Sequence, residues 1–323
     1  MTIEIIEEGL HTTIQDQGRL GYQSYGFSVS GPMDEFAAKM ANILVNNDTD
    51  EAVLEMSFIG PTIKFHQHAI IAITGGNMSA NLNDKPTPLA QPIQVKKDDI
   101  LQFRTVKTGG FGYMAIKGGL DIPKILGSQS TVVRAEVEGV LRGKLAVGDT
   151  ISYSHFYNTE NQLHWGIIPA LFNYIEQPAK IIRYIEGPQY DWFDSDTFAQ
   201  TEWTASTRSN RMGYRLEGLP IKKRKDEQLL TEATTFGSIQ VPPNGQPIIL
   251  MADGQPTGGY PKIGQVARVD LSKVSQLRPG QPFRFQKITV DEAITLLQSR
   301  ERLIRTIQRF CQEKWGGIKL WQE

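Results

Sequence analysis

The sequence contains almost no cysteine: Cys311 is the only one among 323 residues. A disulfide within the chain is therefore excluded, and a thiol on an apolar helical face is typical of a structural cysteine rather than a nucleophile. No apolar run approaches the about 18 residues of a membrane-spanning helix, and the acidic N-terminus is the opposite of a basic signal peptide. We expect a cytoplasmic protein that does not bind membranes.

An excess of charge of either sign is also absent, since 34 Lys and Arg residues nearly balance 35 Asp and Glu residues. The formal net charge of −1 gives no bulk attraction for nucleic acid, which we do not expect as a partner. Gly-Lys-Ser/Thr loops and Gly-x-Ser-x-Gly or Ser-x-x-Lys patterns are missing, which argues against a Walker-type ATP site and a serine nucleophile. His66 and His68 would share one face of a strand, but two ligands do not make a metal site, so none is predicted.

Short strands separated by Gly, Pro, Asn and Asp turns make up most of the sequence, which predicts a mainly β protein. Residues 69–74 form one such strand, which we expect to end at Gly75 and Gly76. Alternating segments that follow charged or proline turns, as in 97–103, 147–153 and 279–285, suit barrel strands with one inward face.

Few helices are expected among these strands. Residues 34–46 have helical spacing after a Gly-Pro break, and a C-terminal helix begins at the capping-box pattern Thr289-Val290-Asp291-Glu292. A length of 323 residues predicts two domains, and a change of composition after Ser154 places their boundary near residue 155.

The stretch 237–261 is nearly free of charge, with Asp253 its one ionised residue. Residues 242–245 read as a tight turn and 248–251 as a short buried strand. The glycines in Thr257-Gly258-Gly259-Tyr260 would let backbone amides converge on an anion, while Tyr260 would add a flat wall with a hydroxyl. Residues 74–77 offer a similar pattern, for which a glycine bulge at a barrel corner is the alternative.

Two arginines lie in turns rich in small residues, and each could bind a carboxylate or phosphate through two parallel hydrogen bonds. Arg19 lies between Gly18 and Leu20-Gly21, and Arg211 lies between Asn210 and Met212-Gly213. We expect Arg211 to be a solvated arginine in a cleft, and a structural pair with Asp16 or Glu217 is the alternative for both arginines. Asp16, Glu55 and Asp253 are candidate acid–base groups if they are buried beside these arginines, and otherwise they would hold turns together.

Several ordered motifs resemble the carboxyltransferase A/B-type family, whose members are described as the C component of 5-oxoprolinase, the second subunit of allophanate hydrolase or the antagonist of a sporulation-kinase inhibitor. The resemblance covers almost the whole chain and rests on seven segments: residues 13–19, Gly31-Pro32-Met33-Asp34, Leu54-Glu55 with Gly60-Pro61, Gly118-Gly119-Leu120-Asp121, residues 127–131, residues 209–218 and residues 237–261. It implies two cyclophilin-like β-barrel domains, 1–155 and 156–323, the second with the C-terminal helix.

The resemblance also implies a function: one subunit of an ATP-dependent 5-oxoprolinase, which opens the lactam of 5-oxoproline to glutamate. ATP, accompanied by magnesium, would act in a complex with a carboxyltransferase C/D-type subunit, similar to the B component of 5-oxoprolinase, and a lactam-utilisation protein similar to the A component. Asp16, Glu55 and Asp253 would then be catalytic, and Arg19, Asn210, Arg211, Thr257, Gly258, Gly259 and Tyr260 would bind substrate or anion. Two alternatives stay open: a biotin-dependent carboxyltransferase acting on urea or a related amide, with biotin on a separate carrier, and a non-enzymatic module that binds a kinase-inhibitor protein.

Overall fold

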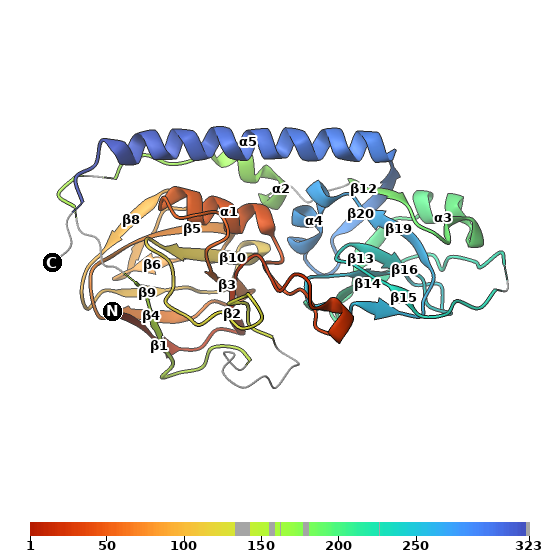
Figure 1. Ribbon diagram of the computed structural model, residues 1–323, viewed down its shortest axis with the longest axis horizontal. Helices are drawn as coiled ribbons and strands as arrows, with labels where there is room; N and C mark the ends of the chain where they lie inside the picture. The colour runs from red at the N-terminus through yellow and green to blue at the C-terminus, as the bar shows by residue number, and fades with distance from the viewer. Residues whose placement is uncertain (133–142, 155–158, 162, 177–180, 226, 321–323) are drawn as a thin grey trace. The chain divides into compact units, whose positions relative to one another are not determined.

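The computed structural model describes residues 1–132, 143–154, 159–161, 163–176, 181–225 and 227–320, and the chain divides into two compact units (Figure 1). The first unit contains Met1–Gly18, Asp34–Glu176 and Arg302–Glu323, and the second contains Arg19–Met33 and Gln177–Glu301. The boundary predicted between residues 155 and 156 lies outside the described residues. Two segments also depart from a simple division of the chain, because residues 19–33 belong to the second unit and the C-terminus belongs to the first.

The first unit is built from two antiparallel sheets. The six-stranded sheet has the order β11 (Thr150–Ser152), β1 (Thr2–Glu7), β4 (Thr62–Phe65), β9 (Ile100–Gln102), β6 (Asn81–Leu82) and β7 (Lys85–Pro86). The five-stranded sheet has the order β2 (His11–Gln15), β3 (Val53–Ser57), β10 (Thr108–Ile116), β5 (Ala69–Asn77) and β8 (Pro92–Val95). Alternation along β1 and β4 places Ile3, Ile5, Ile63 and Phe65 in one apolar core with side chains of the other sheet, such as Leu54.

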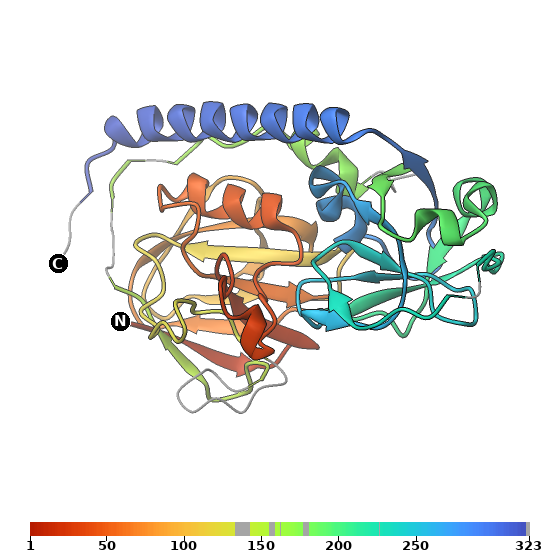
Figure 2. The same cartoon turned by 45° about the vertical axis from the view of Figure 1, so that its right-hand side comes forward.

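Helix α1 (Glu35–Leu44) lies against β3, β5 and β10 of the five-stranded sheet (Figures 1 and 2). Asp34 caps it, because its Oδ1 accepts a hydrogen bond from the Ala37 amide at 3.0 Å. The prediction of a helix in 34–46 is therefore confirmed.

The expectation that Gly75 and Gly76 end their strand is wrong, because β5 runs through both to Asn77. Gly75 has a left-handed φ of +80°, and a Cβ there would lie 2.6 Å from the Phe111 carbonyl oxygen. The glycine thus lets the strand bend while its partner β10 stays close, and the β5–β10 register shifts at this point.

The second unit is a closed seven-stranded barrel. Its strands follow the order β12 (Ile181–Glu186), β19 (Lys262–Val266), β16 (Ser238–Gln240), β17 (Ile248–Leu250), β14 (Gly213–Glu217), β13 (Trp203–Ala205) and β20 (Pro282–Lys287). Parallel pairing of β12 with β20 closes the ring, and Tyr184, Phe198, Trp203, Phe283 and Phe285 pack together in its core. The predicted strand at 248–251 is β17, and the predicted turn forms through a hydrogen bond from the Gly245 amide to the Pro242 carbonyl.

Smaller elements complete both units: η1 (Gln23–Tyr25), η2 (Pro169–Phe172), α2 (Asn173–Glu176), η3 (Tyr190–Trp192), α3 (Ser195–Gln200), α4 (Arg268–Ser275) and the two-stranded ribbon of β15 (Glu232–Ala233) and β18 (Thr257–Gly258). The mainly β class with few helices is thus confirmed, with a closed barrel in the second unit and two sheets in the first.

Helix α5 (Val290–Gly316) carries the chain from the second unit back into the first. Its predicted capping box is present: Thr289 Oγ1 accepts from the Glu292 amide at 3.2 Å, and Glu292 Oε2 accepts from the Thr289 amide at 2.7 Å. Burial raises the pKa of the Cys311 thiol to about 12, in keeping with a structural cysteine. Among the described helices, α5 included, none combines the length and apolarity needed to cross a membrane.

The end of α5 is anchored in the first unit by Trp315, whose Nε1 donates to the Leu44 carbonyl at the end of α1. Lys117 lies over the Trp315 ring, 4.3 Å from its centroid, and its Nζ donates to the Val45 carbonyl at 3.0 Å. Lys117 is buried, and burial lowers its pKa from 10.5 to about 8.

This buried lysine predicts a pH effect on stability. Below pH 8 Lys117 is charged in both states, and the folded protein bears the full cost of burying that charge. Between pH 8 and 10.5 the unfolded chain binds a proton at Lys117 that the folded chain does not, so the free energy of unfolding rises with pH in that window. We expect the free energy of unfolding of the wild type, relative to Lys117→Met, to rise by about 2 kcal/mol from pH 7 to pH 10. Urea unfolding of both proteins at several pH values measures this difference, and a flat difference contradicts it.

Candidate functional site

Arg211 and Asp253, one predicted to bind an anion and the other to act as an acid–base group, form an ion pair in the second unit. Arg211 Nε donates to Asp253 Oδ2 at 2.8 Å, and Arg211 Nη2 donates to Asp253 Oδ1 at 3.0 Å. The side chains are only 7% and 12% exposed. This parallel arrangement matches the planar guanidinium fork to both carboxylate oxygens, and burial strengthens the attraction.

Two turns present the pair. The turn that carries Arg211 is closed by reciprocal backbone bonds between Asn210 and Gly213, and Asn210 Oδ1 accepts from the Met212 amide at 2.9 Å. The turn that carries Asp253 is closed by a bond from the Gly254 amide to the Met251 carbonyl. The Asp253 amide donates to the Arg211 carbonyl at 2.8 Å, so the two turns are joined through backbone as well as side chains.

A third segment, residues 28–31, attaches to both turns. Arg211 Nη2 donates to the Gly31 carbonyl at 2.8 Å, and the Ser30 amide donates to the Ala252 carbonyl at 3.1 Å. Ser28 Oγ donates to the Asp253 carbonyl at 3.1 Å. Arg19, also in the second unit, is buried, and its amide donates to the Val29 carbonyl. The Gly31-Pro32-Met33-Asp34 motif was a signal for this segment, but the sequence did not reveal its contact with Arg211.

The expectation that Arg211 is solvated is therefore wrong. Its guanidinium is enclosed by a carboxylate and a backbone carbonyl, and removing it would leave the Asp253 charge buried and take one donor from the Gly31 carbonyl. Arg211 forms its ion pair with Asp253 and not with Asp16 or Glu217, the partners considered from the sequence.

The predicted anion-binding segment 257–260 begins as strand β18, which pairs with β15. None of these four residues has a left-handed φ, so the backbone does not alternate as an anion-binding nest requires. A Cβ at Gly258 would lie 2.6 Å from Gln240 Nε2, the far end of a flexible side chain that can shift, so this position does not require glycine. Tyr260 is 45% exposed, and its carbonyl accepts from Gln240 Nε2 at 3.4 Å.

Polar side chains that the sequence analysis did not single out surround this ribbon. Lys262 Nζ lies 3.0 Å from Glu232 Oε2 and donates to the Ala233 carbonyl at 2.7 Å. Gln189 joins them by donating from Nε2 to Glu232 and accepting at Oε1 from the Lys262 amide. The hydrogen bond from Lys262 lowers the pKa of Glu232.

Asp16, predicted as catalytic, lies in the first unit and accepts four hydrogen bonds. Oδ1 accepts from the Gly18 amide (2.9 Å), Ser128 Oγ (2.5 Å) and Ser130 Oγ (2.7 Å), and Oδ2 accepts from the Gln129 amide (2.6 Å). These contacts join the end of β2 to residues 128–130, which favours a structural role.

Glu55, the third predicted catalytic residue, is buried on β3 directly opposite Tyr113 of β10. The Tyr113 hydroxyl donates to Glu55 Oε2 at 2.8 Å and accepts from the Asp34 amide at 2.7 Å. Burial and then the nearby carboxylates of Glu55 and Asp34 raise the pKa of Tyr113 well above its usual value. Tyr174 adds a further hydroxyl, which donates to Asp34 Oδ2 at 2.7 Å.

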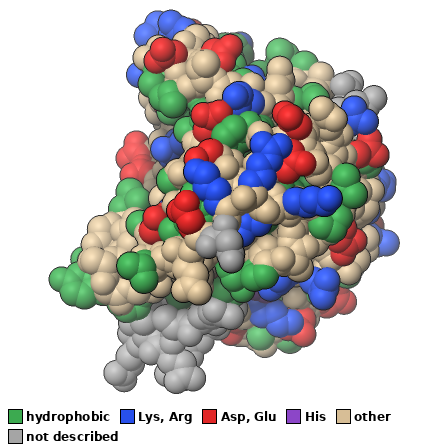
Figure 3. All heavy atoms as spheres, turned by 90° about the vertical axis from the view of Figure 1, so that its right-hand side faces the viewer, with side chains coloured by type: hydrophobic (Ala, Val, Ile, Leu, Met, Phe, Trp, Pro, Cys, Tyr) green, Lys and Arg blue, Asp and Glu red, His purple; other side chains and the backbone are tan. Residues whose placement is uncertain are grey.

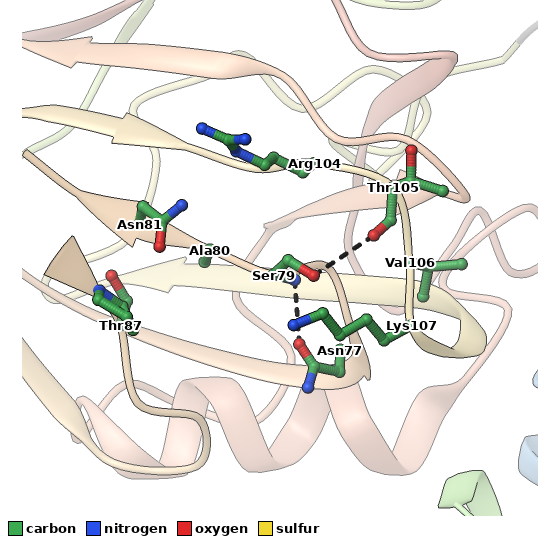
Figure 4. A pocket seen from close by; sticks show the side chains of 10 residues that line it. Asn77, Ser79, Ala80, Asn81, Thr87, Arg104, Thr105, Val106 and Lys107 are labelled. Carbon is green, nitrogen blue, oxygen red and sulfur yellow. Dashed lines mark hydrogen bonds between the residues drawn. The ribbon is translucent and has the colours of Figure 1, made fainter. Parts of the chain in front are cut away.

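An open polar pocket of about 720 Å³ lies elsewhere in the first unit (Figure 4). Its lining contains two basic side chains, Arg104 and Lys107, and no acidic one. The Lys107 side chain extends toward Asn77 and Ser79 in Figure 4, whereas Arg104 donates from Nε and Nη2 to Gln102 Oε1. The pocket can attract an anion, and its only sequence signal was the glycine pattern that ends at Asn77.

Metal ligands do not cluster in the described residues: no group of three or more His, Cys, Asp or Glu side chains could hold an ion there. His66, one of the two histidines considered above, has its Nε2 2.9 Å from Glu4 Oε2. Basic and acidic side chains are interspersed on the face shown in Figure 3, which agrees with the balanced composition.

Comparison with known proteins identifies the family of this chain. The family described as "Carboxyltransferase domain, subdomain A and B" matches residues 25–287. Proteins named as the C subunit of 5-oxoprolinase are similar along nearly their whole length: that of Haemophilus influenzae is 35% identical over 97% of this chain and 99% of its own, and that of Escherichia coli is 34% identical over 93% and 96%. The crystal structure of the K. lactis urea amidolyase matches with a TM-score of 0.85 and 30% identity over 95% of this chain, but only 20% of its own. The chain belongs to the carboxyltransferase A/B family.

Proposed function

We propose that this protein is one subunit of an ATP-dependent 5-oxoprolinase, in which partner proteins complete the reaction. The observation that carries the proposal is the end-to-end similarity to two proteins named as the C subunit of 5-oxoprolinase, which leaves little of either chain unmatched. The word "subunit" in those names favours a complex. The expected partners are a carboxyltransferase C/D-type protein and a lactam-utilisation protein, similar to the B and A components of 5-oxoprolinase.

The chemistry explains why such a complex needs ATP. The lactam carbonyl of 5-oxoproline is a poor electrophile, because the ring nitrogen donates electron density to it. Transfer of the γ-phosphoryl group of ATP to the carbonyl oxygen would release ADP and leave an O-phosphorylated lactam. Water could then attack the ring carbon, and the C–N bond would break as the nitrogen takes up a proton, which gives an acyl phosphate. A second water molecule would displace phosphate from it and leave glutamate. ATP would bring magnesium to the phosphoryl transfer.

This chain's contribution is proposed to be substrate positioning around Arg211 and Asp253. The buried pair fixes the turns at Asn210 and Asp253 together with residues 28–31. The hydrogen-bonding groups of these three segments therefore keep one geometry relative to a substrate. The exposed Tyr260 ring and the 257–259 backbone are proposed as a second, more accessible part of the same substrate-binding region. Arg19 stays a proposed contributor on the segment that leads to residues 28–31.

A second candidate function is a carboxyltransferase component that acts on urea or a related amide with carrier-bound biotin. The observation in its favour is the TM-score of 0.85 to the urea amidolyase. This chain corresponds to only a fifth of that enzyme, so the remaining activities would have to come from other proteins.

We expect the purified chain to release no glutamate from 5-oxoproline and ATP, and the complex with both partner types to release it. The physical reason is that the described residues offer a positioning site but no nucleotide loop or activated nucleophile. Co-expression, gel filtration and an ATP-dependent glutamate assay measure this directly. Glutamate release by the isolated chain, or a co-eluting complex active only on urea with biotin, would refute the proposed function.

A further inference from the structure

Ser30 has two features that are unfavourable for a residue with only a structural role. Its φ is +61°, a left-handed conformation that side chains other than Asn and Asp seldom adopt. It is only 6% exposed, and its Oγ is buried without a hydrogen-bond partner in the described part of the chain. Glycine would avoid both costs, because it adopts left-handed φ freely and has no hydroxyl to desolvate.

These costs fall beside the Arg211–Asp253 pair. The Ser30 amide donates to the Ala252 carbonyl, one residue before Asp253, and the next carbonyl along the chain, that of Gly31, accepts from Arg211 Nη2. The backbone at Ser30 is therefore fixed by one hydrogen bond to the Asp253 turn and by another, one residue later, to Arg211. Strained residues and unsatisfied buried polar groups concentrate at sites where a ligand completes the bonding.

We propose that the Ser30 hydroxyl binds the amide group of the substrate. The inference rests on the proposed function and adds to it a residue that would contact the reacting group. A serine hydroxyl both donates and accepts, so it can donate to an amide carbonyl oxygen or accept from an amide N–H, which suits a lactam and a urea equally. Because Oγ is buried, contact between it and the substrate requires a local shift of residues 28–31.

The inference predicts opposite effects of one substitution on stability and activity. In the assembled complex, Ser30→Gly should melt at the same or a higher temperature than wild type, because strain and an unsatisfied hydroxyl are both removed. The kcat/KM for 5-oxoproline should fall at least about tenfold, equivalent to about 1.4 kcal/mol, and binding of 5-oxoproline without ATP, measured by calorimetry, should weaken by a similar factor. Ser30→Ala should lose the same activity while it keeps the backbone strain.

Asp98→Gly is the matched control, since Asp98 also has a left-handed φ, +67°, in an exposed turn of the first unit. It makes the same change to glycine at a left-handed position outside the proposed site, and it should leave kcat/KM unchanged. Unchanged binding and kcat/KM in both Ser30 variants would overturn the inference.

Wild-type complex is tested first on 5-oxoproline and on urea, so that the two proposals can fail separately. Activity on urea alone refutes the proposed function, and the same variants then test Ser30 with urea. A wild-type complex that binds neither amide overturns both.

Discussion

Replacing Arg211 by alanine is expected to abolish glutamate release by the complex and to lower the free energy of unfolding by about 3 kcal/mol. The stability loss follows from burial: Asp253 would keep its charge without the guanidinium, and the Gly31 carbonyl would lose one donor. The activity loss follows because the turns at Asn210 and Asp253 and the segment 28–31 share this one side chain. Urea unfolding and single-turnover assays on the folded fraction measure the two effects separately.

A double-mutant cycle identifies the source of the destabilisation. Asp253→Ala alone should be similarly destabilising. The double variant should lose less stability than the two single variants lose together, because no unpaired charge is left buried. Arg211→Lys keeps the charge and loses the planar fork, so it should recover part of the stability and little of the activity. Additive losses in the cycle, or normal activity per folded molecule in Arg211→Ala, would contradict the assignment.

The elements that the sequence predicted correctly depend on residues close together in the chain. The capping box of α5 needs only Thr289 and Glu292, three residues apart, and the strand at 248–251 needs only an apolar run after a Pro-Pro-Asn-Gly turn. The helix at 34–46 follows from its own spacing and its Asp34 cap. Such local signals do not depend on the rest of the fold.

The site geometry depends on long-range pairing, which local patterns do not encode. Arg211 and Asp253 are 42 residues apart, and Arg211 and Gly31 are 180 apart. The sequence singled out Arg211 and Asp253 but could not pair them, because strand register decides which turns meet. The same holds for Gly75. A Cβ there would lie 2.6 Å from the Phe111 carbonyl oxygen on β10, and the sequence does not show that β10 lies beside this residue.

Replacing Asp16 by alanine is expected to destabilise the first unit by about 4 kcal/mol. Four donors now converge on one carboxylate, and two of them are the hydroxyls of Ser128 and Ser130, which are almost fully buried. Each buried donor left without a partner costs about 1–3 kcal/mol, partly offset where water can enter the space that the side chain leaves. Urea unfolding, with circular dichroism to report the sheets, measures the loss.

Two further variants separate this structural role from the catalytic role predicted for Asp16. Asp16→Asn keeps the size and one acceptor oxygen but turns an amide donor toward existing donors, so it should lie between wild type and alanine in stability. Ser130→Ala removes one donor to the carboxylate and also the acceptor of the Asp16 amide, so it should cost about 2 kcal/mol. If Asp16 only holds residues 128–130 to β2, the folded fraction of Asp16→Asn keeps the kcat/KM of the wild-type complex. A near-native free energy of unfolding combined with complete loss of turnover would instead make Asp16 a catalytic residue.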